Sequence, residues 1–255
     1  MRRVVLVVVP VALLLAACGG SSSPKASGPD PGTAAAKTIA TGSARFTVLV
    51  GAIVGGSPVQ SSETGTISFS ARRAHIYKLI PGSSMGQELI VDGAFTYTNA
   101  NVEAALKDKS VKPWTKLDTR RLTPKQVKSH PDELAHVSVM VHLLDGVHNV
   151  RKFDSMDVAG QRVTEFRGDV QPTRVVAKAP VAQRASLAQA LRNDYPARPF
   201  LASFWLDDAG RVRRVLVNYH TAGGTSISLD GRFSEFGITV DTTPPPARST
   251  ADITP

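Results

Sequence analysis

The sequence predicts an α+β domain built on one large, curved antiparallel sheet. Most segments between residues 33 and 241 carry the residue pattern of strands, and short turn sequences join several of them in pairs. Only three segments carry the pattern of helices. Consecutive strands joined by short turns pair antiparallel. A few helices inserted among runs of strands pack onto such a sheet, which is the arrangement of an α+β domain.

The first half of this region contains β-branched runs and hairpin sequences. Residues 64–70 alternate apolar and polar side chains, and this period of two is typical of a half-buried strand. Asp92-Gly93 separates two short apolar segments, and an Asp-Gly pair favours the tight turn of a hairpin. Strands are therefore expected at 44–54, 64–70, 75–80, 89–91 and 94–97.

The second half repeats this pattern of paired strands. Ala159-Gly160 joins one pair, and the run from Asp207 to Gly210 joins another, with Gly at a position that suits a left-handed turn. Two further segments complete the sheet. Strands are therefore expected at 147–158, 162–166, 200–206, 212–219, 226–229 and 231–240.

Three segments predict helices. Residues 33–41 are short and Ala-rich. Residues 131–144 place four apolar side chains on one face, and Ser129 can cap their start. Residues 181–192 carry Leu187 and Leu191 four positions apart, so both lie on one face.

The first twenty residues carry the pattern of an export signal. Arg2 and Arg3 precede an apolar run of 14 residues at 4–17, whereas a membrane-spanning helix needs about 20. The run ends in small residues. We therefore expect residues 1–17 to be a signal peptide rather than a permanent anchor.

Leu15-Ala16-Ala17-Cys18 resembles the lipobox of bacterial lipoproteins. In that class of protein the Cys thiol is diacylated and the chain is cut just before it. Cys18 is the only cysteine of the chain, which favours lipidation over a disulfide. An ordinary secretory signal with a chance Cys is the alternative. Lipidation predicts a protein held at the outer face of the cell membrane through diacylglyceryl-Cys18.

Composition divides the mature chain into three parts. Residues 18–32 are rich in Gly, Ser and Pro and predict a flexible tether. Residues 33–241 form the folded domain. Residues 242–255 include three consecutive prolines and predict a disordered tail.

The chain carries a net charge of +9. A basic surface suits anionic headgroups or an acidic wall polymer, although it can equally be a solvated surface without a partner. Export makes nucleic acid an unsuitable partner.

Five short motifs follow one another through the domain. They are VDGAFTY at 91–97, PWTKL at 113–117, VAGQRVTEFRG at 158–168, FWLDDAGRVRR at 204–214 and FGITV at 236–240. Together with the lipobox, their order resembles the LppX/LprAFG-type lipoproteins of actinobacteria, which share a fold with the LolA/LolB lipoprotein carriers. The resemblance covers about residues 35–241.

The resemblance implies a half-open antiparallel barrel with helices over its concave face and an apolar cavity between them. Members of this family bind lipids or lipidated molecules there and help to move them across the envelope, so a membrane transporter is an expected partner. The family has no shared catalytic residues. On this basis the candidate cavity residues are Leu134, Val137, Val141 and Leu144 of the expected helix, and Ile67, Phe69, Leu89, Val91 and Phe95 of the strands. Each of these residues could instead belong to a solid core.

Other motifs do not point to chemistry. Gly82-Ser83-Ser84-Met85-Gly86 matches the G-x-S-x-G pattern of a hydrolase, with Ser84 as the nucleophile. That pattern needs a helix after the serine, whereas residues 87–91 predict a strand. The six histidines lack the i, i+4 spacing with an acidic neighbour that zinc sites use, so no metal or cofactor is expected.

We therefore expect a non-enzymatic, lipid-binding envelope lipoprotein whose ligand is a lipid or glycolipid. A scaffold or partner-binding lipoprotein with a closed pocket is the first alternative. An esterase that uses Ser84 is the second.

Overall fold

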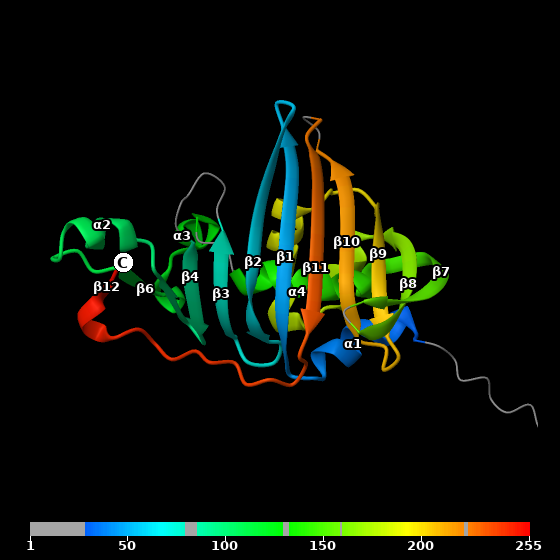
Figure 1. Cartoon of the computed structure of the whole chain (residues 1–255), viewed down its shortest axis with the longest axis horizontal. Helices are drawn as coiled ribbons and strands as arrows, with labels where there is room; N and C mark the ends of the chain where they lie inside the picture. The colour runs from blue at the N-terminus through cyan, green and yellow to red at the C-terminus, as the bar shows by residue number, and fades with distance from the viewer. Residues whose placement is uncertain (1–28, 80–85, 130–132, 159, 222–223) are drawn as a thin grey trace, which may run out of the picture.

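The computed structural model describes residues 29–79, 86–129, 133–158, 160–221 and 224–255. Within these residues, twelve strands form one open sheet, and helices pack on one of its faces (Figure 1). The predicted α+β class with a curved, half-barrel sheet is confirmed. None of the helices in these ranges is long and apolar enough to span a bilayer.

The sheet keeps neighbours in sequence next to each other in space. Its order is β12-β6-β5-β4-β3-β2-β1-β11-β10-β9-β8-β7, and only the β12–β6 pair is parallel. Two long connections cross the sheet: the segment from β6 to β7, which contains α3 (Pro124–Ser129) and α4 (Glu133–His142), and the segment from β11 to β12, whereas β11 pairs with β1 in the middle of the sheet. The strands are β1 (Ser43–Val54), β2 (Ser57–Ser68), β3 (Arg73–Leu79), β4 (Gln87–Asp92), β5 (Phe95–Thr98), β6 (Trp114–Asp118), β7 (Val147–Val158), β8 (Gln161–Val170), β9 (Phe200–Asp207), β10 (Val212–His220), β11 (Ser226–Ser234) and β12 (Thr250–Asp252).

Alternation along β1 separates the two faces of the sheet. Phe46 and Val48 are fully buried on the face that carries the helices, which we call the inner face. Arg45 and Thr47 alternate with them and therefore point to the opposite, outer face. A one-residue shift in register would exchange the two sets, so burial of the inner face fixes the pairing of β1 with β2 and β11.

Four helices, α1 (Pro31–Ile39), α4, α5 (Pro172–Lys178) and α6 (Arg184–Asp194), contribute to the core on the inner face. α1 begins at Asp30, whose side chain caps Gly32 N–H at 2.9 Å. α4 continues into the 3₁₀ turn η2 (Leu143–Gly146), and α6 follows η3 (Val181–Gln183). α2 (Val102–Lys107) and α3 are shorter helices, and η1 (Thr119–Arg121) and η4 (Ala247–Ser249) are 3₁₀ turns.

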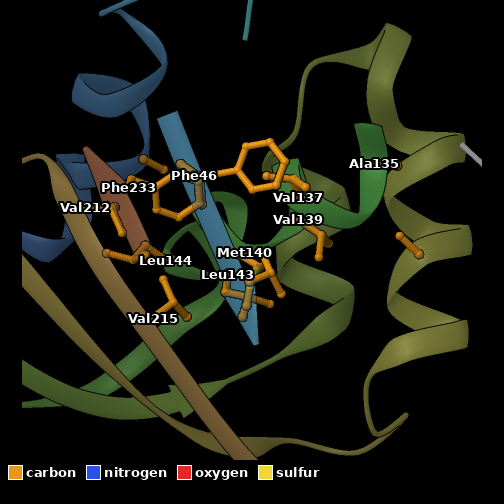
Figure 2. Close-up of a cluster of buried hydrophobic side chains, with 14 of the residues drawn as sticks. Phe46, Ala135, Val137, Val139, Met140, Leu143, Leu144, Val212, Val215 and Phe233 are labelled. Carbon is orange, nitrogen blue, oxygen red and sulfur yellow. The ribbon is translucent and has the colours of Figure 1, made fainter. Parts of the chain in front are cut away.

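One buried cluster joins the helices to the sheet. α4 and η2 contribute Val137, Met140 and Leu144, which meet sheet residues such as Phe46 and Phe233 (Figure 2). Burial of this apolar surface is the main force that holds the helices on the sheet.

Several sequence expectations differ from the structure. α2, α3, α5, β6 and the first half of β2 were not expected, and two expectations in the C-terminal part are wrong. The strand expected at 226–229 and the first part of the one expected at 231–240 form a single strand, β11, because Asp230-Gly231 continues the pairing with β1 instead of turning, and residues 235–240 are not a strand. The tail at 242–255 is not disordered. It forms η4 and β12, and β12 pairs with the edge strand β6, where Thr254 Oγ1 accepts a hydrogen bond from Asp118 N–H at 2.9 Å.

Candidate functional site

Most predicted cavity residues lie together in the buried cluster between α4 and the sheet. Eight of the nine are at most 9% exposed and belong to this cluster, namely Leu134, Val137, Val141, Leu144, Ile67, Phe69, Leu89 and Val91. Phe95 lies apart, half-buried, with Lys116 and Arg120 over its ring at 4.8 and 5.1 Å. That these residues line a cavity stays a prediction.

The centre of the interface is closely packed. Gly231 of β11 faces α4, and a Cβ atom at this position would lie 2.5 Å from Met140 Sδ. The absence of a side chain at Gly231 therefore makes room for the Met140 thioether. Val137 and Val141, on the same helix, have no exposed surface. At this level the helix packs flush on the sheet.

A hollow of about 190 Å³ lies at one edge of this interface, between the β2–β3 turn, α4 and α6. Phe69, Leu134 and Leu187 provide its apolar surface, and Ser138 and Gln183 are among its polar lining residues. Two of the predicted cavity residues, Phe69 and Leu134, therefore border an open space between sheet and helices.

An apolar row lies at the end of the inner face next to the β1–β2 turn, where the helices cover the sheet only partly. Val59, Ala52, Ile227 and Tyr219 are paired in sequence across β2, β1, β11 and β10, so they form one row on the inner face. Val59 is 36% exposed and the other three are half-buried, whereas Phe46 and Val48 nearer the middle of β1 are fully buried. A hollow of about 390 Å³ is lined by this row and by eight residues of the two rows beside it, among them Gly51, Ile53 and Ser228, which alternate with the apolar row and therefore belong to the outer face.

Four ionisable side chains gather on the inner face close to this row. Lys78 Nζ of β3 lies 3.2 Å from Glu63 Oε1 of β2, and each side chain is 15% exposed. His136 Nδ1 of α4 lies 2.9 Å from Asp194 Oδ2 at the end of α6. We call Glu63, Lys78, His136 and Asp194 the polar cluster. Tyr219 joins it to the apolar row, because the tyrosine hydroxyl donates a hydrogen bond to the Asp194 carbonyl.

The environment of His136 favours its protonated form. Burial, the largest influence, lowers the pKa of His136. The hydrogen bond to Asp194 and the negative charges of Glu63 and Asp194 outweigh it, and the pKa is raised above its ordinary value.

Sequence reasoning missed the apolar row and the polar cluster. The alternation of β1 and β2 shows which residues share a face, but it carries no information about how far the helices extend along that face. Glu63 and His136 are separated by 73 positions, and no local motif links them.

Two candidate residues from the sequence, the lipidation site Cys18 and the nucleophile Ser84, lie outside the described residues. β4 begins at Gln87 as a strand, where a nucleophile elbow would continue as a helix. Within the described ranges, no group of three or more His, Cys, Asp or Glu side chains is arranged to hold a metal ion.

Comparisons with known proteins give similarity in structure but not in sequence. No known protein family matches the sequence. No curated protein matches it either. Among solved structures, the chain is similar to the lipoprotein LppX of Mycobacterium tuberculosis, with 13% identity, 83% of this chain and 97% of LppX covered, and a TM-score of 0.49.

Two further structures show the same kind of similarity. LprF of Mycobacterium bovis has 13% identity, with 86% of this chain and 99% of LprF covered and a TM-score of 0.46. A LolA superfamily protein of Nitrosomonas europaea has 9% identity, with 78% and 90% covered and a TM-score of 0.29. These are the kinds of protein that the sequence motifs resemble, and at such identities the similarity concerns the fold alone.

Proposed function

We propose that this protein is a membrane-anchored envelope lipoprotein that binds the acyl chains of a lipid or glycolipid on the inner face of its sheet and helps to carry them. The observation that carries this proposal is the apolar row of Val59, Ala52, Ile227 and Tyr219, which the helices leave partly uncovered on the inner face. The lipobox at Leu15–Cys18 supports the anchoring.

Burial of methylene groups supplies the affinity in this mechanism. Each methylene removed from water gains about 0.8 kcal/mol. A chain that buries about eight methylenes therefore gains about 6 kcal/mol, more than the lower estimates of about 4 kcal/mol for the cost of association. No catalytic group is needed, and release requires only a second apolar surface to accept the chain.

A change in the rotamer of Met140 would enlarge the proposed site. Its unbranched thioether fills the space above Gly231, and such a side chain changes rotamer easily. When Met140 turns away, the space above Gly231 extends the inner face from the apolar row toward the core. The acyl chain then lies between β11 and α4.

A specific observation favours one alternative function. The flush packing of Val137, Val141 and Met140 on the sheet is what a closed pocket would show. A scaffold lipoprotein that binds a protein partner would need no more than this packed core. The partly exposed apolar row is the feature that favours the lipid carrier over it.

Native mass spectrometry of the chain after exposure to lipid tests the proposal. The chain is produced from residue 18 onward with Cys18→Ser, which keeps every described residue, and it is exposed to total lipid extract. Ala52→Trp fills the apolar row. Thr47→Trp is the matched control, because it places the same side chain on the outer face of the same strand.

A lipid carrier should retain about one lipid per chain in the starting protein and in Thr47→Trp, and lose it in Ala52→Trp. A bare protein mass after exposure to lipid would reject lipid binding and favour the scaffold. Equal retention in both tryptophan variants would reject the apolar row as the site.

A further inference from the structure

One end of the sheet is built from sequence without charged residues. Because neighbouring strands run antiparallel, the ends of β1 and β10 and the starts of β2 and β11 meet there, and β1, β2 and β11 extend beyond the helices (Figure 1). Residues 46–62 and 215–229 contain no Asp, Glu, Lys or Arg, although 20% of the chain is charged. We call residues 51–60, 218–220 and 226–228 the uncharged end.

The opposite end of the sheet is charged. The turns between β2 and β3, between β4 and β5, and between β9 and β10 lie there. Charged residues in or next to these turns are Arg72, Arg73, Asp92, Asp207, Asp208 and Arg211. Both ends are made of strands and tight turns, so strand formation does not explain the difference in charge between them.

Apolar side chains lie on both faces of the sheet at the uncharged end. Val59 on the inner face is 36% exposed, and Ile53 on the outer face is 52% exposed. Leu79, at the same end of β3, is 61% exposed on the outer face. A protein interface has an apolar core on one face and a polar rim around it. Exposed apolar groups on both faces, with no charge among them, instead fit a medium that surrounds the end, as the surface region of a bilayer does.

The length of the uncharged end suits the depth of that region. The first charged residue along β2 is Glu63, six positions from its start, and the first along β11 is Asp230, four positions from its start. These separations correspond to about 20 and 13 Å. The headgroup region of one leaflet is about 5–8 Å deep. The end can therefore pass through this region before a charged side chain reaches it.

The backbone of the uncharged end also tolerates contact with lipid. β2 pairs with β1, β1 with β11 and β11 with β10 as far as Ile53, Ser226 and His220. Backbone groups that are already paired lose no hydrogen bond to water when lipid replaces it.

We propose that the uncharged end enters the headgroup region of a lipid bilayer, with Ile53, Val59 and Leu79 in contact with lipid. This contact goes beyond the proposed function, because it concerns a surface that the protein binds whether or not it carries a cargo. It brings the apolar row against the bilayer, since Val59 and Ala52 belong to both. No charged side chain takes part, so the contact needs no anionic lipid and persists at high salt.

A fluorescent label at each end of the sheet tests this proposal. The chain from residue 18 with Cys18→Ser contains no other cysteine, so a single introduced cysteine can carry NBD, whose emission shifts to the blue in apolar surroundings. Ser57→Cys places the label at the start of β2, and Ser70→Cys places it in the charged β2–β3 turn; both side chains are exposed. Each protein is mixed with vesicles of phosphatidylcholine, or of phosphatidylcholine with phosphatidylglycerol, at about 0.15 and 0.5 M salt.

A matched pair of substitutions measures the contribution of one side chain to vesicle binding. Ile53→Lys introduces a charge at the uncharged end. Ile253→Lys is the control, because Ile253 is 50% exposed, nearly as much as Ile53, but follows β12 at the edge of the sheet. Flotation of the unlabelled proteins with phosphatidylcholine vesicles gives the bound fraction.

We expect a blue shift on phosphatidylcholine for the label at residue 57 and none for the label at residue 70, at both salt concentrations. Ile53→Lys should weaken binding by about tenfold or more, and Ile253→Lys should leave it unchanged. Binding that requires phosphatidylglycerol and is lost at the higher salt would assign the contact to the basic surface and overturn the proposal. Equal shifts at both labels, or a shift that grows with protein concentration in the absence of vesicles, would overturn it as well.

Discussion

Replacement of Gly231 by alanine tests the contact on which the closed centre of the interface depends. The added Cβ would lie 2.5 Å from Met140 Sδ and 2.8 Å from Met140 Cε, whereas ordinary carbon contacts begin near 3.4 Å. Met140 must therefore leave its position. Overpacking of this kind costs about 1–3 kcal/mol of unfolding free energy. Because the clash is with the end of a flexible side chain, we expect the variant to fold.

A double-mutant cycle isolates this contact. Met140→Ala alone should cost about 2–5 kcal/mol through the cavity that it leaves. In that background, Gly231→Ala meets no clash and restricts the unfolded chain, so it should be neutral or stabilise by about 0.4–1 kcal/mol. The two substitutions should therefore be coupled by about 1 kcal/mol or more.

Urea unfolding of the four proteins, followed by fluorescence and circular dichroism together, gives the four free energies. Gly51→Ala is the control, because its Cβ would meet only Ser228 Cβ at an ordinary 3.9 Å. The reasoning is refuted if Gly231→Ala costs the same with and without Met140, since α4 would then not pack on β11 at this point.

Three further predictions concern other parts of the structure. Gly65→Ala places a Cβ 2.1 Å from the His75 carbonyl oxygen, and because a backbone atom cannot turn away, we expect a loss above about 3 kcal/mol or no soluble protein. Circular dichroism and soluble yield check this, and a stable, folded variant would contradict it. The raised pKa of His136 means that its stabilising effect is fully present below its unfolded pKa, near 6.5, and is lost as the pH rises through the folded value. His136→Gln should therefore lose more stability at pH 5.5 than at pH 9 in urea unfolding, and an equal loss at both values would argue against this assignment. Removal of residues 247–255 takes β12 from the edge of β6 and should produce concentration-dependent association in light scattering; a strictly monomeric truncated protein would show that β12 does not protect this edge.

Local patterns in the sequence account for most of the sheet. Alternation and turn residues predict the β4–β5, β7–β8 and β9–β10 pairs, because each pair depends on residues close together in the chain. They fail at β11, where Asp230-Gly231 has the residues of a turn. A glycine occurs at position 231 for a reason unrelated to a turn. It packs against Met140, which lies 91 positions earlier in the chain, and this contact leaves no room for a side chain.

The candidate site is harder to predict because it depends on distances between elements. The spacing of Leu134, Val137 and Val141 shows that one face of α4 is buried, and the structure agrees. The same spacing does not show whether the opposing surface is a strand or an open space. The three prolines in residues 242–255 predict a disordered tail, yet the three residues of β12 are enough to pair with β6 at the edge of the sheet.

The position of α1 bears on the direction in which the protein faces. α1 precedes the start of β1, and the apolar row lies near the other end of that strand, which at twelve residues is about 36 Å long (Figure 1). The row at Ala52 lies nine residues, about 30 Å, along β1 from its first residue. If the chain is anchored at Cys18 as proposed, the anchor would join the domain at the end opposite the apolar row, so attachment to one bilayer would leave the row uncovered.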